Sequence, residues 1–378
     1  MYIIRVGEIV TKDWYNWFVK TALVYDRLNK WGGAERVMLA LHKLFPRAPL
    51  YTSVYDKKRA PWAKVFNVKT SFLQGLPFAK HHELYAPLMP IAFENFNFDE
   101  FDLVISVTSE AAKGIITKPQ TKHICYCLTP TRYLWSGYDD YFKNPILQFL
   151  SKPFVWYLRF WDKIAANRPD KFIAISKEVQ SRISKYYGKE STVVYPPLGI
   201  DGRKWEVEGS VYHPSSYFLI VSRLVPYKKI DLAIKAFNKL KLPLKIIGTG
   251  SEMGKLKEMA KSNIEFLGNL TDKELVGYYS ECRALVFPGV EDFGLAILEA
   301  QGFGKPVIAF RAGGALETIV EGKTGLFFGE QSVGSLSAAI ERFNNITIDA
   351  KDCVEQASKF SVEMFKKQFM NAINNVAI

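Results

Sequence analysis

Short apolar segments alternate with helical segments along most of this chain, and this alternation restricts the possible folds more than any other feature. In the first half, the apolar segments occupy 21–25, 50–54, 103–107, 122–127, 172–176 and 193–195. A second series begins at 218–222 and continues at 244–247, 264–267 and 284–288. Residues with helical periodicity follow most of these segments, so neighbouring strands should run in the same direction. The pattern predicts an α/β fold with two parallel sheets.

The length of the chain and one proline-rich segment predict where the two sheets are divided. A chain of 378 residues is long enough for two hydrophobic cores. The segment Pro196–Asp201 has the composition of a hinge between domains. We therefore expect an N-terminal domain over 1–197, a C-terminal domain over 198–360 and a terminal helix over 361–378. Residues 1–18 precede the first predicted strand, and they are either a small extra element or a leader from a start codon placed too early.

The positive charge of the chain is concentrated in its first half. The formal net charge is +12. Residues 1–200 carry 28 Lys and Arg against 17 Asp and Glu, whereas residues 201–378 carry 22 against 21. A basic surface of this kind suits an anionic membrane, a phosphate-bearing acceptor or a nucleic acid. The alternative is that the charge serves only solubility.

Cysteine usage and hydropathy predict a cytoplasmic protein. Cys125, Cys127, Cys282 and Cys353 form no Cys-x-x-Cys pair, which favours free buried thiols in a reducing compartment. No apolar run reaches the roughly 18 residues that a membrane-spanning helix needs. The start of the sequence also lacks the continuous apolar core of a signal peptide. No His, Cys and carboxylate set has the spacing of metal ligands, so we expect no metal.

The stretch from Glu291 to Glu299 contains the residues that most strongly indicate a function. A predicted strand precedes it and a predicted helix over 295–302 follows Gly294. Glu291 should therefore lie at the carboxyl edge of a parallel sheet, where ligands bind, and Glu299 two turns into the helix. The N–H groups of Gly294 and Leu295 begin that helix and suit a phosphate. Taken alone, two glutamates at this spacing are more often a solvated pair.

Basic residues follow the first strand of the second series. Arg223 and Lys228 come directly after 218–222, so they should lie on the same sheet edge as Glu291. Two basic groups at that edge suit a diphosphate. Gly248 and Gly250 follow the next strand and are assigned to the same binding edge.

The run from Phe287 to Thr318, which also contains 304–309 and the 313–318 segment GGALET, resembles the donor-binding region of glycosyltransferase family 4. Members of that family are retaining enzymes of the GT-B fold, and the resemblance extends over about 21–375. It implies two Rossmann-like domains with an active site in the cleft between them. It also implies that the terminal helix crosses back to the N-terminal domain.

Two motifs of the first half add to this resemblance. Residues 32–35, GGAE, resemble the Gly-Gly-Ala/x-Glu loop of family 4, which faces the cleft near donor and acceptor. Residues 128–135, LTPTRYLW, resemble a His-Thr-Pro-x-Arg-Tyr-x-Trp motif of a mannosyltransferase-like branch. Leu128 stands where that branch has histidine, so no imidazole is assigned to catalysis. We assign Gly32, Glu35, Arg132 and Tyr133 to the acceptor or sugar side.

Physical chemistry and the resemblance together assign roles to the second half. Arg223 and Lys228 should stabilise the departing nucleoside diphosphate without a metal, and Glu291 should favour a positively charged anomeric carbon. By resemblance, Glu299 should bind the ribose hydroxyls. The complete set assigned to donor binding is Glu299, Gly294, Leu295, Gly248, Gly250, Gly33 and Phe293.

The predicted function is transfer of a sugar, with mannose from GDP-mannose as the first choice, to a glycan or polyprenyl-diphosphate-linked acceptor. The enzyme would act in surface polysaccharide synthesis, as a peripheral protein at the inner face of an anionic membrane. One alternative is a GT-B nucleotide-sugar 2-epimerase, and another is a basic nucleic-acid-binding protein, although we expect no nucleic acid. A dinucleotide-dependent dehydrogenase is disfavoured, since no Gly-x-Gly-x-x-Gly motif is complete.

Residues 141–165 mix aromatic and basic side chains, and two interpretations of them remain open. They form either a helix that contacts a membrane or a core helix with its polar face in water, and we favour the core helix. Pro145 and Pro153 should prevent a single long helix.

Overall fold

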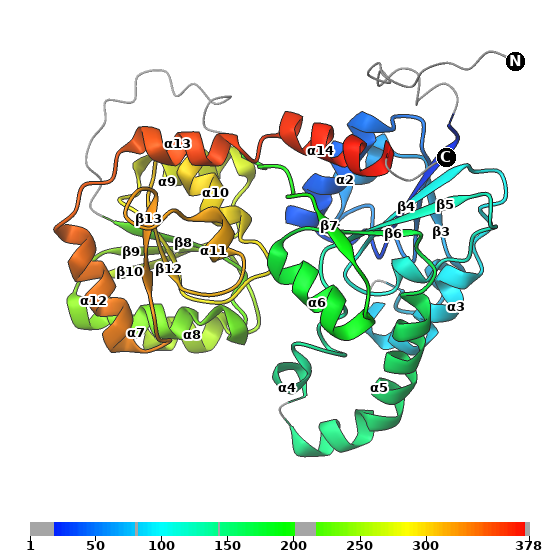
Figure 1. The fold of residues 1–378 in the computed structure, drawn as a ribbon. Helices are drawn as coiled ribbons and strands as arrows, with labels where there is room; N and C mark the ends of the chain where they lie inside the picture. The colour runs from blue at the N-terminus through cyan, green and yellow to red at the C-terminus, as the bar shows by residue number, and fades with distance from the viewer. Residues whose placement is uncertain (1–18, 80–81, 143, 201–216, 375–378) are drawn as a thin grey trace, which may run out of the picture. The chain divides into compact units, whose positions relative to one another are not determined.

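The computed structural model describes residues 19–374 except 80–81, 143 and 201–216. The leader 1–18 therefore lies outside the described residues. The chain divides into two compact units, each built on a parallel sheet (Figure 1). Unit 1 comprises 1–175, 179–194 and 366–378, and unit 2 comprises 176–178 and 195–365.

Unit 1 is organised around a seven-stranded sheet with the order β3-β2-β1-β4-β5-β6-β7. All neighbouring strands are parallel, as in the pairing of Val24 with Ser106. The strands are β1 (Thr21–Tyr25), β2 (Leu50–Thr52), β3 (Val68–Thr70), β4 (Leu103–Thr108), β5 (Lys122–Cys127), β6 (Lys171–Ala174) and β7 (Ser191–Val193). The central strands β1 and β4 are buried throughout, because helices cover both faces of a parallel sheet.

The α-helices of unit 1 connect these strands. They are α2 (Gly33–Leu44), α3 (Met89–Glu94), α4 (Tyr138–Tyr141), α5 (Pro145–Ala165) and α6 (Lys177–Tyr187). Short 3₁₀ helices are η1 (Pro61–Val65), η2 (Phe72–Gly75), η3 (His82–Leu88) and η4 (Ala112–Gly114). The last helix, α14 (Val362–Asn374), packs Phe369 against Tyr126 of β5, with ring centroids 5.7 Å apart. Lys171 also donates a hydrogen bond to the carbonyl of Ala372 in that helix.

Unit 2 has a six-stranded parallel sheet with the order β10-β9-β8-β11-β12-β13. The strands are β8 (Phe218–Val221), β9 (Leu244–Ile247), β10 (Ile264–Gly268), β11 (Leu285–Phe287), β12 (Val307–Phe310) and β13 (Gly325–Phe328). The helices are η6 (Pro226–Lys228), α7 (Ile230–Leu240), α8 (Met253–Met259), α9 (Asp272–Glu281), α10 (Leu295–Gly302), α11 (Ala315–Thr318), α12 (Val333–Asn344) and α13 (Ala350–Ser358).

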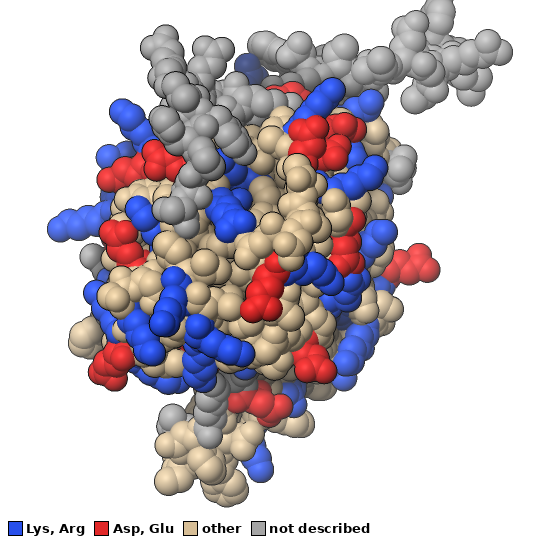
Figure 2. Space-filling model, turned by 90° about the vertical axis from the view of Figure 1, so that its left-hand side faces the viewer, with Lys and Arg blue, Asp and Glu red and all other residues tan. Residues whose placement is uncertain are grey.

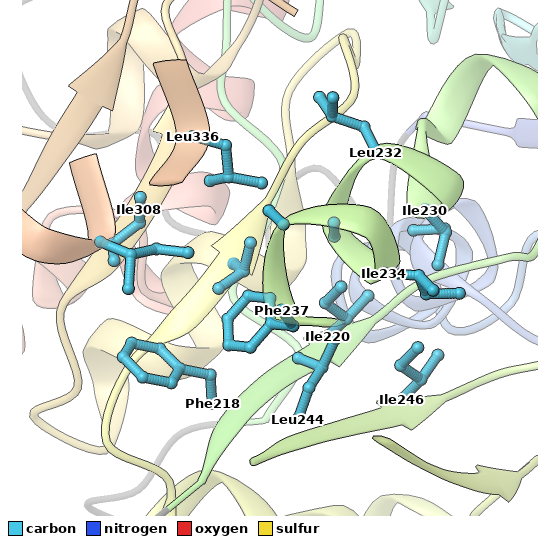
Figure 3. Packing of buried hydrophobic residues seen from close by; sticks show 14 of the residues in the cluster. Phe218, Ile220, Ile230, Leu232, Ile234, Phe237, Leu244, Ile246, Ile308 and Leu336 are labelled. Carbon is cyan, nitrogen blue, oxygen red and sulfur yellow. The ribbon is translucent and has the colours of Figure 1, made fainter. Parts of the chain in front are cut away.

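The core of unit 2 lies on both faces of this sheet. On one face, Phe218 and Ile220 of β8 pack against Phe237 of α7, with Ile308 and Leu336 completing the cluster (Figure 3). The opposite face packs against α9 and α10. The result is a layer of helices on each side of the sheet, which confirms the predicted α/β fold with two parallel sheets.

The ends of several strands and the continuity of one helix differ from the sequence prediction. The second strand ends at Thr52, and the last strand of unit 1 is 191–193 rather than 193–195. The expected interruption at Pro153 is wrong, because α5 is one helix of 21 residues with that proline inside it. Pro153 is exposed, so the carbonyl that loses its intrahelical partner lies on the face accessible to water.

Candidate functional site

The two central strands of unit 2 define its most favourable site for a ligand. From β8 the chain builds the sheet outward through β9 and β10, and from β11 it builds in the opposite direction. Ligands of open parallel sheets bind beyond the carboxyl ends of the strands at this reversal. The loop 222–229 follows β8 and the loop 288–294 follows β11, so both begin at that point.

Lys228 and Glu291 form an ion pair between these two loops. Lys228 is the last residue of η6 and is 6% exposed, whereas the Glu291 side chain is 27% exposed. The Lys228 ammonium also lies 5.2 Å and 5.9 Å from the ring centroids of Tyr227 and Phe287. Lys229 has φ of 54°, an unfavourable left-handed conformation for a residue other than glycine. The turn therefore keeps a cation and a carboxylate together at the partly shielded edge of the sheet.

Arg223 lies on the same loop as Lys228 and remains exposed. Its guanidinium donates a hydrogen bond to the hydroxyl of Tyr227, with 2.8 Å between Nη2 and Oη. The structure thus places the three residues that the sequence assigns to catalysis, Arg223, Lys228 and Glu291, on two adjacent loops.

Glycines allow the loop 288–294 to contact its neighbours closely. A Cβ atom on Gly289 would lie 2.7 Å from Cα of Lys228, and one on Gly314 would lie 2.2 Å from Cα of Phe293. The Gly314 N–H also donates to the Glu291 carbonyl at 2.9 Å. Any larger residue at either glycine would displace the backbone that holds the ion pair. The sequence did not single out Gly289, since a lone glycine after a strand is a weak signal.

Gly248 and Gly250 have a packing role that accounts for their presence. Gly248 has φ of 133°, and a Cβ atom there would lie 1.8 Å from the Ser222 carbonyl oxygen. A Cβ atom on Gly250 would lie 2.2 Å from the carbonyl oxygen of Leu224. The loop after β9 therefore rests directly on the loop that carries Arg223 and Lys228. Contact of these glycines with a donor remains a prediction.

Helix α10 is enclosed by the rest of unit 2. Gly294, with φ of 89°, precedes its first residue, Leu295, which is half-buried. Phe293 is buried and stacks on Tyr195, with ring centroids 5.5 Å apart. Glu299 is 4% exposed and accepts a hydrogen bond of 2.8 Å from the Tyr279 hydroxyl. Tyr279 is a partner that the sequence did not indicate.

Unit 1 has a corresponding reversal between β1 and β4, and it also carries charged residues. Asp26 follows β1 and accepts hydrogen bonds from four successive backbone N–H groups, those of residues 109–112. Arg27 forms a 2.6 Å ion pair with Glu110, and their side chains are 14% and 19% exposed. Burial lowers the pKa of Arg27, but the Glu110 and Asp26 carboxylates outweigh it, so the guanidinium is held charged. The sequence patterns did not single out Arg27 and Glu110, although they come two and three residues after the predicted strands 21–25 and 103–107.

The Gly32–Gly33 loop lies at the same edge, at the start of α2. Glu35 is buried beneath it and accepts a 2.6 Å hydrogen bond from the Tyr25 hydroxyl, so its carboxylate belongs to the core of unit 1. Burial first, and Glu35 second, raise the pKa of Tyr25 well above its ordinary value.

Trp31 is an exposed aromatic residue directly before this loop. It is 42% exposed, and the Arg36 guanidinium lies 5.7 Å from its ring centroid. The Trp62 ring is 6.1 Å away, and its indole N–H donates to the carbonyl of Lys30. A fixed, partly exposed indole offers a flat apolar surface beside a polar loop. No sequence motif singled out Trp31.

Arg132 and Tyr133 lie in the turn after β5, and both are half-buried. The Arg132 carbonyl accepts from the N–H of Gly137, and the Tyr133 ring lies 6.2 Å from that of Tyr141. Leu128, in the family's histidine position, is half-buried at the end of the same strand. The residues assigned to the acceptor side therefore follow β1 and β5 at one edge of the first sheet.

Three other observations concern the metal ligands, membrane-spanning helices and cysteines considered from the sequence. Among the described residues, no cluster of three or more His, Cys, Asp or Glu could hold a metal ion. None of the helices in the described ranges is long and apolar enough to span a bilayer. All four cysteines are buried and free, as expected.

Residues 203–360 match the model of a family described as Glycosyl transferases group 1. This region contains Arg223, Lys228, Glu291 and Glu299. The match covers the sheet of unit 2 and assigns that unit a glycosyltransferase group 1 domain.

Curated relatives are similar over part of their length. The chain is 29% identical to an uncharacterised glycosyltransferase of Methanocaldococcus jannaschii, over 54% of this chain and 58% of that protein. It is 27% identical to a GDP-mannose-dependent alpha-(1-6)-phosphatidylinositol monomannoside mannosyltransferase of Mycolicibacterium smegmatis, over 46% of this chain and 53% of that protein. The chain thus spans about half the length of the curated relatives it matches.

Solved structures are similar over nearly the whole chain. The Anabaena protein HepE in complex with UDP-glucose has a TM-score of 0.71 at 20% identity, covering 94% of this chain and 100% of HepE. WaaG, a glycosyltransferase involved in lipopolysaccharide biosynthesis, has a TM-score of 0.67 at 14% identity, covering 95% and 100%. At these identities the likeness concerns the fold.

Proposed function

We propose that this chain, whose two parallel-sheet units have the GT-B fold, transfers a sugar from a nucleotide-sugar donor to a hydroxyl group of an acceptor. The observation that carries the proposal is the Lys228–Glu291 ion pair at the strand reversal of a glycosyltransferase group 1 domain. A cation and a carboxylate at that point suit the two charges that develop when a glycosidic bond to a diphosphate breaks.

The leaving diphosphate gains negative charge as the bond breaks, and the proposed site has groups to receive it. Lys228 and exposed Arg223 lie on the loop after β8, where both can approach phosphate oxygens. The N–H groups of Gly294 and Leu295 begin α10 and supply further donors. These groups would stabilise the leaving group without a metal.

In this proposal the two glutamates bind different parts of the donor. Glu291 lies in the loop and is partly exposed, so we assign to it hydrogen bonds from the sugar hydroxyls and stabilisation of a positively charged anomeric carbon. Glu299 is held by Tyr279 inside α10, and it is assigned to the ribose by resemblance. The resemblance also supports transfer with retention at the anomeric carbon.

GDP-mannose is the proposed donor. Support comes from the similarity of the run 287–318 to mannosyltransferases of family 4 and from the GDP-mannose-dependent mycobacterial relative. HepE was solved with UDP-glucose, so the GT-B fold accommodates other nucleotide sugars. The donor therefore has to be tested against UDP-glucose directly.

The acceptor is proposed to bind unit 1, which carries the basic excess of residues 1–200. A glycan or a polyprenyl diphosphate at an anionic membrane surface would fit that charge. Trp31 and the Arg27–Glu110 pair lie at the carboxyl ends of the central strands of this unit. They offer an apolar surface and polar groups to a sugar.

The test is a donor panel with released nucleoside diphosphate as the readout, in which GDP-mannose and UDP-glucose are compared with and without EDTA. We expect release with GDP-mannose that survives chelation, and loss of about 100-fold or more in Lys228→Ala, from the size of single electrostatic contributions at such sites. Exposed Lys239 of α7 provides the matched control, Lys239→Ala, which should keep full activity. The proposal would be refuted if no donor gave release of a nucleoside diphosphate. It would also be refuted if the protein only converted the donor in the absence of an acceptor and transferred no sugar to one.

A further inference from the structure

Helix α5 exposes a continuous apolar face. Val155, Leu158, Trp161 and Ala165 form its buried stripe. A second stripe, beside the first, is also apolar but exposed, and comprises Ile146, Phe149, Leu150, Phe154, Trp156, Tyr157, Phe160 and Ile164, each between 38% and 72% exposed. These residues recur at spacings of three and four, so they share one face of the helix. The prediction of a core helix is therefore confirmed for the inner side of α5, but the expectation that its face in water is polar is wrong.

The exposed stripe is too large for an ordinary surface of a monomer. Isolated exposed hydrophobic residues are common, but a contiguous apolar patch of this kind marks an interaction surface. The helix has 21 residues and so extends over about 30 Å. In Figure 2, the end of the molecule where α4 and α5 lie is largely uncharged, with a few separate charged side chains.

Charged residues of α5 favour a lipid surface over a second protein. On a helical wheel, Lys152, Arg159 and Lys163 fall along one border of the exposed stripe. The only acidic residue of the helix, Asp162, is buried and paired with Lys113. Aromatic residues on one face with basic residues beside them are typical of helices that lie in a membrane interface. The neighbouring α4 carries the exposed Asp139, which opposes the attraction to anionic lipid, so we expect the apolar contact to dominate.

The helix is also fixed to the core of unit 1. The Lys113 and Asp162 side chains are each 1% exposed and form an ion pair. The Asp162 carboxylate also accepts hydrogen bonds from Thr131, Trp135 and Tyr187. Burial opposes the charge of Lys113, but Asp162 outweighs it and raises the pKa of the ammonium. Because its inner side is held this firmly, α5 cannot turn its exposed stripe inward.

We propose that the exposed stripe of α5 inserts into the interface of an anionic lipid bilayer and attaches unit 1 to it. The proposal rests on the proposed transfer to a membrane-borne acceptor for its purpose, but its evidence is the stripe itself. It differs from a purely electrostatic attachment, since Phe154 and Phe160 rather than lysines should supply most of the affinity.

The test is flotation of the full chain with vesicles of phosphatidylcholine alone or mixed equally with phosphatidylglycerol. We expect Phe154→Ser/Phe160→Ser to weaken binding to the mixed vesicles about ten-fold or more, because two large apolar side chains no longer leave water. Val65→Ser, at an equally exposed aliphatic residue of η1, should bind like the wild type. Lys152→Gln/Lys163→Gln should reduce the preference for anionic vesicles by a smaller factor, and added salt should do the same.

Unchanged vesicle binding by the double phenylalanine variant would overturn the proposal. The proposal would also be overturned if the wild type were a dimer and this variant a monomer, with vesicle binding the same in both. The stripe would then contact a second copy of the chain. Nucleoside diphosphate release with a soluble acceptor is measured on the same samples. If the wild type binds vesicles but releases no nucleoside diphosphate, the proposed function fails and the membrane proposal stands. If the double phenylalanine variant releases nucleoside diphosphate at the normal rate but binds vesicles less, both the proposed function and the membrane proposal stand.

Discussion

Replacing Lys228 by methionine should separate the structural role of its ion pair from the catalytic role. Lys228 is 6% exposed and its partner Glu291 has a 27% exposed side chain. Removing one partner of a fully buried pair costs about 3–5 kcal/mol, because the other charge is left without compensation. Water reaches Glu291, so we expect a smaller loss in the free energy of unfolding, about 2 kcal/mol.

A double-mutant cycle with Glu291→Gln tests this reasoning. In Lys228→Met, the transition of unit 2 should fall by about 4–8 °C, from the usual shift per kcal/mol for a domain of about 150–250 residues. Adding Glu291→Gln removes the uncompensated carboxylate, so about half of that loss should return. Activity should not return, because each residue is assigned to a different charge of the transition state. Both single variants and the double variant should turn over about 100-fold or more slowly.

Two assays are used. Thermal unfolding is monitored by circular dichroism, and activity is measured as the release of nucleoside diphosphate from GDP-mannose. Exposed Lys235→Met on α7, which pairs with Asp231 at 3.6 Å, is the control for loss of an ordinary surface pair. It should change neither quantity appreciably. If Lys228→Met unfolds and turns over like the wild type, the pair has neither role. If the double variant regains activity together with stability, the loss came from misfolding, and the electrostatic assignment is wrong.

Three further predictions concern single residues. Glu299→Gln should raise the KM for the donor while kcat stays close to normal, since the ribose is bound alike before and during reaction; steady-state kinetics check this, and a selective fall in kcat would refute it. Burial, and then Arg168, lower the pKa of His123 to about 3. His123 therefore stabilises the fold above pH 6.5, and as pH falls from 6.5 toward 3 stability is lost by up to about 1.4 kcal/mol per pH unit, or about 2 kcal/mol at pH 5. Urea unfolding at pH 7 and pH 5 should show this loss in the wild type and a smaller one in His123→Asn. Trp31→Ala should raise the KM for a glycan acceptor several-fold and leave the KM for the donor unchanged, and equal changes in both would contradict an acceptor role.

Sequence patterns predicted the sheets and the loops of the candidate site because those depend on short-range periodicity. Glu291 and Lys228 each follow a buried strand, and parallel strands end at one edge, so their proximity could be expected. The contacts of Gly289 and Gly314 could not be predicted, since they depend on which loops pass each other in space. The same is true of Tyr279, which lies twenty positions before Glu299 and on another helix.

The wrong expectation for the outer face of α5 has a different physical cause. An apolar stripe on a helix usually indicates burial, and α5 has two such stripes, so the sequence alone does not say which one meets the core. Asp162 decides this, because its carboxylate needs the donors of Lys113, Trp135 and Tyr187. A lone aspartate among aromatic residues does not reveal partners that lie 25 or more positions away along the chain.

The four donors that surround Asp162 have a geometric consequence for any membrane-bound state. They come from η4, from the turn after β5 and from α6, so they prevent rotation of α5 about its own axis. An enzyme attached through a flexible tail samples many tilts, whereas a helix immobilised in this way presents a single orientation. The carboxyl edge of the first sheet would then stand at one height above the lipid head groups. The distance that an acceptor extends from the membrane surface, rather than its affinity, would then determine which lipid-linked glycans are used.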